Sequence, residues 1–298
     1  MDMLPKVIAI IGTNASGKSE LGVKLACRYS GEIISADSRQ VYCGLDVGSG
    51  KISQEEMCGI PHYMIDICRA GEFFSMAEFQ RKSYKIIDDI LSRKKIPFVV
   101  GGTGLYVDSV LDGYLLSDKA PDLAYRMELE KLSTKQLYNM LLIQNPNVNV
   151  DRYNRNRVMR MLERIHDGDN VVADKQMRYQ SLRLGVSWPR EVLNKRIDER
   201  LERRVQQGMI EEVRNLIDQG VDPQFLIRLG LEYRFITQYA LGIIESKEEM
   251  ISQLSHAIKK FAKRQMTWFK RNQDIIWLEM DKDPYNEACR AIESLLMN

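Results

Sequence analysis

Eight residues near the start of the chain have the spacing of a phosphate-binding loop, G-x-x-x-x-G-K-[ST]. They are Gly12, Thr13, Asn14, Ala15, Ser16, Gly17, Lys18 and Ser19. Glycine lets such a loop turn its backbone N–H groups toward an anion, and the helix that follows adds the positive end of its dipole. Lys18 supplies a mobile positive charge, and the Ser19 hydroxyl is a ligand type that Mg²⁺ accepts. The spacing therefore predicts a site for a diphosphate or triphosphate, with Ser19 as the metal ligand.

The neighbourhood of these eight residues argues against a chance match. The apolar run Val7–Ile11 precedes them and predicts a buried strand, and a helical pattern starts at Lys18. A strand before the loop and a helix after it are the context that a phosphate loop requires. The motif does not identify the molecule that carries the phosphates.

A carboxylate follows the next strand-like segment. Asp37 ends the run Glu32–Ala36, and in a parallel sheet it would lie at the same edge as the phosphate loop. It could bind magnesium, or take a proton as a general base. It could also only cap a turn, because Asp-Ser is common in turns. Its position at the end of a strand favours the functional roles, and Asp66 is a weaker rival at the end of another run.

Two further segments could complete a site. Gly101, Gly102 and Gly104 surround Thr103 in a second strand-to-helix turn, where glycines let another molecule approach the backbone. Tight strand-helix packing is the alternative. Arg200 repeats Arg196 at i+4 on a predicted helix, and an arginine could neutralise a departing diphosphate. Surface ion pairs are the alternative for these arginines.

The charge is distributed unevenly along the chain. The net charge is +2, but residues 151–273 hold 24 Lys/Arg against 17 Asp/Glu and the remainder holds 19 against 24. Two segments, Asp151–Arg160 and Ala262–Arg271, interleave cations with aromatic residues. Basic residues can bind backbone phosphates while aromatic rings stack on bases. The pattern indicates a polyanion partner, although solvated helix faces and core aromatics would give a similar sequence.

The elements that must position these residues alternate between strand and helix through residue 112. Runs at 7–11, 32–36, 63–67 and 97–100 predict strands, and patterns at 18–29, 75–92 and 104–111 predict helices. Ser75 and Glu78 form a capping box that marks a helix start. This alternation predicts an α/β fold with a mainly parallel sheet flanked by helices.

Residues 113–180 lack strand runs, and we interpret them as a helical insertion into a core formed by 1–112 and 181–298. Within the insertion, helical patterns lie at 123–132, 134–143 and 156–166. Beyond it, 182–186 and 275–278 predict strands, and 190–206, 210–219, 232–241 and 247–271 predict helices.

Composition excludes several classes of protein. The five cysteines form no C-x-x-C pair and the three histidines are widely separated, which indicates neither a disulfide framework nor a zinc site. The sequence contains no secretory leader pattern and no run of 18 apolar residues, so we expect a cytoplasmic protein without a membrane partner.

Taken together, the motifs resemble those of the tRNA dimethylallyltransferase, or isopentenyltransferase, family. The matching segments are 12–19, 32–42, 59–62, 101–106, 196–200 and 262–268. Their ordered occurrence from Ile8 to Trp277 is far more specific than the phosphate loop alone. Members of the family are similar to P-loop kinases in fold, but their loop holds the diphosphate of dimethylallyl diphosphate.

The resemblance implies that the chain transfers a dimethylallyl group to N6 of the adenosine on the 3′ side of a tRNA anticodon and releases diphosphate. Asp37 would accept the N6 proton, while Lys18, Arg200 and Ser19 with Mg²⁺ would stabilise the diphosphate. Thr103 would position the flipped nucleotide or the donor. The residues that would contact the anticodon stem-loop are Asp37, Ser38, Arg39, Gln40, Thr103, Arg126, Asn156, Arg157, Val158, Met159, Arg160, Arg228 and Arg234. We expect a monomer.

Some residues depart from the family pattern, and three other functions stay open. Thr13 and Asn14 stand where the family usually has Pro and Thr, and Arg39 replaces the commoner Met, so their effect on substrate preference is open.

The same loop could serve an ATP-dependent small-molecule kinase, a non-catalytic RNA-binding switch, or an enzyme that prenylates free adenine nucleotides. The basic half of the chain argues against the kinase, and an intact Lys18–Ser19 pair with Asp37 argues against the switch.

Overall fold

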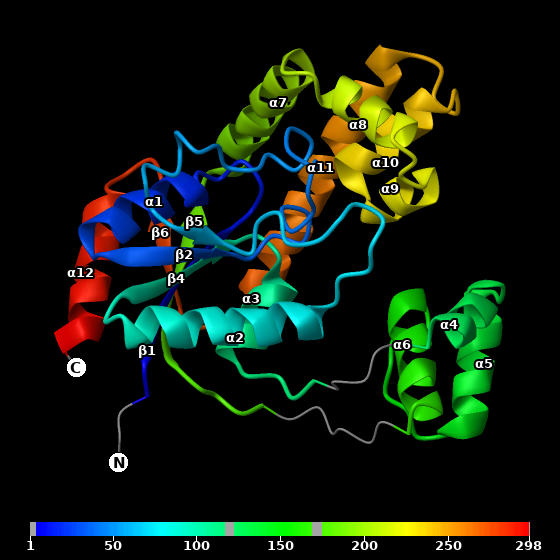
Figure 1. Ribbon diagram of the computed structural model, residues 1–298, viewed down its shortest axis with the longest axis horizontal. Helices are drawn as coiled ribbons and strands as arrows, with labels where there is room; N and C mark the ends of the chain where they lie inside the picture. Colours follow the sequence, from blue (N-terminus) through cyan, green and yellow to red (C-terminus); the bar gives the residue numbers. More distant parts are fainter. Residues whose placement is uncertain (1–3, 117–121, 169–174, 298) are drawn as a thin grey trace. The chain divides into compact units, whose positions relative to one another are not determined.

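A computed structural model describes residues 4–116, 122–168 and 175–297 of the chain. Contacts divide them into two compact units, Met1–Gly113 with Met177–Asn298 as the larger and Tyr114–Gln176 as the smaller. The larger unit contains a six-stranded sheet in which every pairing is parallel, in the order β3-β2-β4-β1-β5-β6 (Figure 1). The prediction of a mainly parallel α/β fold is therefore confirmed.

The strands of this sheet are short, as is usual in α/β proteins. Their bounds are β1 Lys6–Gly12, β2 Gly31–Ser35, β3 His62–Tyr63, β4 Ile96–Gly101, β5 Gln180–Ser187 and β6 Ile275–Glu279. The helices of the larger unit are α1 Lys18–Arg28, α2 Met76–Ser92, α3 Gly104–Leu111, α7 Arg190–Gln206, α8 Met209–Asp218, α9 Pro223–Leu229, α10 Leu231–Ala240, α11 Lys247–Phe269 and α12 Pro284–Met297.

Helices cover both faces of the sheet because its strands are apolar on both sides. On one face, Ile8 and Ile10 of β1 pack in a core with residues of α1 and α12. On the other, Val7, Ala9 and Ile11 pack with residues of α2, α3 and the end of α11. Figure 1 shows α1 and α12 on the opposite side of the sheet from α2. A third apolar cluster joins α7, α8, α10 and α11 to the loop after β2.

The smaller unit has a core of its own. Its helices are α4 Leu123–Glu130, α5 Thr134–Gln144 and α6 Arg155–His166. Leu137, Leu141, Val158 and Leu162 are fully buried between them. This unit is helical among its described residues, and α4 to α6 lie at the predicted helical patterns.

Three details of the predicted elements are wrong. The strand predicted at 63–67 pairs only through His62 and Tyr63, because Met64 and Asp66 take positive φ angles of 64° and 53° that turn the chain out of the sheet. Helices α9 and α12 were not predicted. α9 is only seven residues long and starts at Pro223, while α12 starts at Pro284 after the polar stretch Asp281–Asp283. Proline at a helix start was the available signal in both.

No helix in the described ranges has both the length and the apolar character that crossing a bilayer requires.

The capping box at the start of α2 gives a test of local stability. Ser75 Oγ accepts from Glu78 N at 3.1 Å, and the Glu78 carboxylate accepts from Ser75 N at 2.9 Å. Replacing Ser75→Ala should lower the free energy of unfolding by about 1 kcal/mol, because a backbone N–H at the helix start loses its partner. Urea unfolding monitored by circular dichroism measures this change.

Ser252→Ala, at an exposed position inside α11, is the matched control and should change stability by less than about 0.5 kcal/mol. Equal effects of the two substitutions would contradict the capping role of Ser75.

Candidate functional site

The phosphate loop joins β1 to α1 and is shaped by two residues with positive φ. Ala15 has φ 60° and Gly17 has φ 87°, and these turns direct the loop around the start of α1. Gly12 leaves no room for a side chain, since a Cβ there would lie 2.5 Å from Cγ2 of Val186. The hydroxyl of Ser16 is buried without a hydrogen-bond partner. These features fit a cradle for a phosphate group.

Side chains from α7 and from the segment between β5 and α7 hold the loop's carbonyl groups. Arg196 Nε donates to Ala15 O at 3.0 Å, and Trp188 Nε1 donates to Ser16 O at 2.9 Å. The Arg196 guanidinium also lies over the Trp188 ring, 4.7 Å from its centre. Arg196 therefore holds the loop from outside, whereas Arg200 one turn later lines the pocket.

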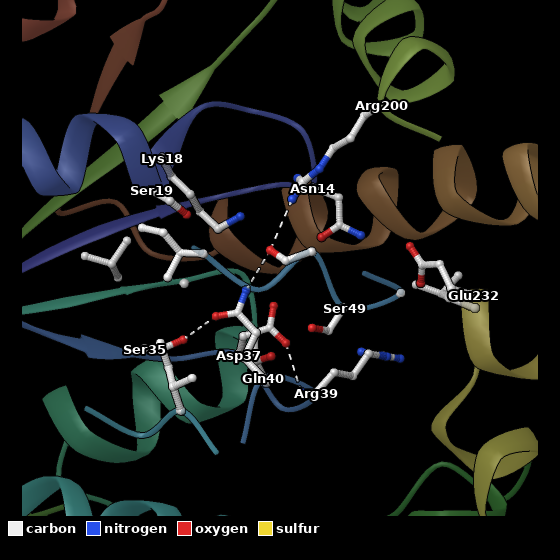
Figure 2. A pocket seen from close by; sticks show the side chains of 18 of the residues that line it. Asn14, Lys18, Ser19, Ser35, Asp37, Arg39, Gln40, Ser49, Arg200 and Glu232 are labelled. Carbon is white, nitrogen blue, oxygen red and sulfur yellow. Dashed lines mark hydrogen bonds between the residues drawn. The ribbon is translucent and has the colours of Figure 1, made fainter. Parts of the chain in front are cut away.

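One pocket collects the residues that the sequence assigned to the reaction. Lys18, Ser19, Asp37, Thr103 and Arg200 all line it. Figure 2 shows the Lys18 and Arg200 side chains directed into the same space as the Asp37 carboxylate. The pocket lies at the carboxyl ends of β1, β4 and β2, three neighbouring strands of the sheet. The structure therefore brings these five residues together, while their individual roles stay predictions.

Asp37 has both a structural contact and a free oxygen. Its Oδ1 accepts from Arg39 N at 2.9 Å, which is the turn cap considered as one alternative. No described residue forms a hydrogen bond with Oδ2, so this oxygen can serve a substrate donor. The rival acid, Asp66, instead pairs with Lys51 and does not line this pocket.

Thr103 connects the second glycine turn to the loop that carries Asp37. Its N–H donates to Ala36 O at 3.1 Å, and its Oγ1 accepts from Ser38 N at 3.1 Å. Gln40 is also held at both ends of its amide, accepting from Ser35 Oγ at 2.9 Å and donating to Gly50 O at 3.2 Å (Figure 2).

Positive charge dominates the pocket. Lys18, Arg39, Arg200 and Arg204 face two acids, Asp37 and Glu232. Glu232 is buried and pairs with Arg204 at 3.2 Å, so it compensates the arginine farthest along α7. The remaining excess of cations fits an anionic ligand such as a diphosphate.

Burial and neighbouring cations alter the ionisation of two of these groups. Desolvation, with repulsion from Arg200, lowers the pKa of Lys18 to about 8, although Asp37 acts in the opposite direction. Desolvation and the charge of Arg204 lower the pKa of Arg200 to about 10. Both cations are thus destabilised without a bound anion, and an anion in the pocket would favour their charged forms.

The residues predicted to contact RNA fall into separate groups. Asp37, Ser38, Arg39, Gln40 and Thr103 lie around the pocket. Arg39 Nη2 donates to Leu229 O at 2.6 Å, and its Nε is buried without a partner. Arg228 is exposed and lies 3.7 Å from Asp222, whereas Arg234 lies over the Phe235 ring. Neither Arg228 nor Arg234 lines the pocket.

Another group lies in the smaller unit. Glu163 is buried there and pairs with Arg126 at 3.1 Å and with Arg160 at 3.3 Å. The Asn156 and Arg157 side chains are exposed. Val158 and Met159 are buried in the unit's apolar core, so any side-chain contact of this segment with RNA would come from its polar members.

Sequence reasoning did not single out Gln265, Glu232 or Arg204 as site residues. Gln265 occupies a core-facing position of α11, in register with the buried Ile258, Ala262 and Phe269. A polar residue on an otherwise apolar helix face was the signal that could have found it. Glu232 and Arg204 had no such signal, because charged residues on helices usually face solvent.

The parallel sheet, the phosphate loop and the cation-lined pocket define a P-loop protein with an anion site beside a carboxylate. A family model described as IPP transferase matches residues 40–272. A tRNA dimethylallyltransferase 2 of Citrifermentans bemidjiense is 41% identical over 297 residues, covering 98% of this chain and 96% of that protein. The chain belongs to the IPP transferase family.

Solved structures agree with this assignment. A tRNA isopentenylpyrophosphate transferase of Bacillus halodurans superposes with a TM-score of 0.73 at 36% identity, covering 97% of each chain. A eukaryotic dimethylallyltransferase acting on tRNA has a TM-score of 0.78 at 24% identity, covering 97% of this chain and 78% of that one. This second likeness concerns the fold.

The lowered pKa of Lys18 predicts how anion affinity depends on pH. The ammonium form attracts the anion and is lost as the pH rises through about 8. The affinity for inorganic pyrophosphate should therefore fall above this pH, and binding there should take up protons because the anion raises the pKa of Lys18. Calorimetry in buffers of different ionisation enthalpy measures both quantities.

Lys18→Met should bind pyrophosphate weakly, and its affinity should lose the fall that the titration of Lys18 causes above about pH 8. Lys24→Met, an exposed position of α1 where the lysine pairs with Glu20, should retain the wild-type profile. A wild-type profile in Lys18→Met would show that another group titrates.

Proposed function

We propose that this enzyme transfers a dimethylallyl group from dimethylallyl diphosphate to N6 of the adenosine on the 3′ side of a tRNA anticodon. The observation that carries the proposal is the shared pocket of Lys18, Arg200 and Asp37. Cations suit the leaving diphosphate, and a carboxylate with a free oxygen suits an amine that must lose a proton. The names of the relatives support tRNA as the acceptor.

Bond changes in this reaction occur at the allylic carbon and at N6. The bond between the allylic carbon and the diphosphate oxygen breaks, and its electron pair leaves with the diphosphate. The N6 nitrogen forms the new bond to that carbon and transfers its proton to Asp37 Oδ2, from which solvent removes it. Positioned cations stabilise the charge that develops on the leaving group.

Lys18 and Arg200 would bind the diphosphate from two elements. Lys18 Nζ now donates to Thr13 O at 3.2 Å, and Arg200 Nη2 lies 3.5 Å from Gly50 O. Both groups therefore rest against backbone carbonyls at the pocket wall. The anion would compete with those carbonyls and raise the pKa of each group toward its ordinary value.

The pocket also fits a magnesium ion. The Ser19 side chain is exposed at the pocket, and Asp37 offers carboxylate oxygen, so both donors are of the hard type that Mg²⁺ prefers. In the described ranges, no three His, Cys, Asp or Glu residues are grouped so that they could hold a metal ion. When bound, Mg²⁺ would neutralise charge on the diphosphate.

A stacked adenine could not present its amine inside this pocket. Enzymes that act on a base within a folded nucleic acid take the base out of its stack. The anticodon stem-loop is accordingly the proposed recognition element, with a single copy of the chain as the acting unit. Asn156, Arg157 and Arg160 are proposed to contact its phosphates.

Asp37→Asn tests the assigned base. Asn retains an oxygen for Arg39 N but cannot accept the N6 proton, so kcat for tRNA prenylation should fall by roughly 10²- to 10⁴-fold. Transfer of label from the prenyl donor to tRNA, followed by digestion to nucleosides, measures the rate and identifies the modified base.

The tRNA affinity of Asp37→Asn should stay within about threefold of wild type, because the change removes no phosphate contact. Asp66→Asn is the matched control and should retain near-normal turnover. Full turnover in Asp37→Asn would exclude Asp37 as the base.

Salt dependence tests the proposed RNA contacts of the smaller unit. Arg157 is exposed, and no described residue pairs with it. Arg157→Ala should weaken tRNA binding and reduce the slope of log K against log salt by about 1, since one phosphate contact is lost. Filter binding over a range of salt concentrations measures the slope. Lys82→Ala, on the exposed side of α2, should leave it unchanged, and equal slopes for all three proteins would remove Arg157 from the interface.

A further inference from the structure

Gln265 of α11 connects the two glycine-containing turns of the pocket. Its Oε1 accepts from Asn14 N at 3.0 Å, and its Nε2 donates to Gly102 O at 2.8 Å. The residue is 6% exposed; its bond to Gly102 O is buried and its bond to Asn14 N is partly buried. These two bonds span 251 and 163 residues of sequence.

A carboxamide of this length satisfies both partners. The Asn14 N–H requires an acceptor and the Gly102 carbonyl requires a donor, and the Gln side chain offers both on one planar group that does not titrate. The fit is tight, because a Cβ on Gly102 would lie 2.6 Å from Gln265 Nε2 and 3.1 Å from Gly12 O. Either group left without its partner would cost the full desolvation of a buried amide.

The connection continues from Gly102 to the carboxylate. Thr103 N donates to Ala36 O, and Thr103 Oγ1 accepts from Ser38 N, both at 3.1 Å. Asp37 lies between these two partners. The hydrogen bonds of Gln265 and Thr103, joined by the peptide bond between Gly102 and Thr103, thus connect the phosphate loop to the backbone on either side of Asp37.

A second residue of α11 fixes the same turn. Trp268 Nε1 donates to Asp108 Oδ2 of α3 at 2.7 Å. Its ring lies against Gly104, where a Cβ would approach Cδ1 to 2.3 Å. One face of α11 therefore holds both the Gly102 carbonyl and the start of α3.

We propose that Gln265 is a positioning residue that sets the distance between the phosphate loop and the Asp37 carboxylate. The inference rests on the proposed roles of those two groups. The proposed reaction transfers the allylic carbon from a diphosphate oxygen to the N6 nitrogen. The phosphate loop would hold the diphosphate, and the N6 nitrogen would lie beside Asp37. An error of about 1 Å between such groups can lower a rate by roughly 10²-fold.

Gln265→Met tests this role because Met has a similar volume but forms neither bond. We expect kcat for tRNA prenylation to fall roughly 10- to 100-fold, with the tRNA Kd and the donor KM within about threefold of wild type. Gln253→Met is the matched control on the same helix, where the Gln253 side chain is exposed and donates to Glu249, and it should retain wild-type kcat.

Gln265→Glu tests the positioning role through the pH dependence of kcat, which a purely structural role of Gln265 would leave unchanged. A carboxylate still accepts from Asn14 N but cannot donate to Gly102 O, whereas the protonated acid can do both. Burial raises the pKa of a carboxyl group at this position, whereas the cations Lys18, Arg39 and Arg200 of the same pocket act in the opposite direction. Because only the protonated acid forms both bonds, the kcat of Gln265→Glu relative to wild type should rise as the pH is lowered from about 8 to about 6, while the ratio for Gln265→Met stays flat.

The outcomes separate this inference from the proposed function. If wild type fails to prenylate tRNA, the proposed function is wrong. If wild type is active and Gln265→Met has a kcat within twofold of it, or changes only KM, Gln265 does not position the loops. If Gln265→Met fails to fold, the pH ratio of Gln265→Glu decides, and a flat ratio overturns the inference.

Discussion

Parallel pairing of β2, β4 and β1 is the constraint on which the site depends. Three loops leave the carboxyl ends of these adjacent strands, and they carry Asp37, Thr103 and Lys18. Parallel strands place these ends at one edge, so residues separated by more than 60 positions line one pocket. Burial of the apolar residues on both faces of these strands stabilises the arrangement. Helices α1 and α12 cover one face, and α2 and α3 cover the other.

Electrostatic imbalance gives this edge its preference for anions. Among the described residues, Glu232 is the one acid that forms an ion pair with a pocket arginine, Arg204, and desolvation lowers the pKa values of Lys18 and Arg200. Desolvation disfavours the charged forms of these two side chains, and a bound anion would offset that penalty. The same excess of charge suits a diphosphate that becomes more negative as its bond to carbon breaks.

The smaller unit contains a buried carboxylate whose charge is compensated by arginines. Glu163 inside it pairs with Arg126 and Arg160, which compensates its charge and limits the movement of two long side chains. The independent apolar core around Leu137 and Leu162 lets this unit maintain that arrangement by its own packing.

Local sequence determined the phosphate loop, most helices and the central strands, because each depends on neighbours a few residues away. The capping box at Ser75 and Glu78, the apolar run of β1 and the glycine spacing of 12–17 are signals of this kind. Tertiary structure decided the short extent of β3, where positive φ at Met64 and Asp66 turns the chain away. It also decided the partners of Gln265 and Glu232. The partners lie far away in sequence, Asn14 and Gly102 for Gln265 and Arg204 of α7 for Glu232, so only the packing of α11 and α10 against these segments could reveal them.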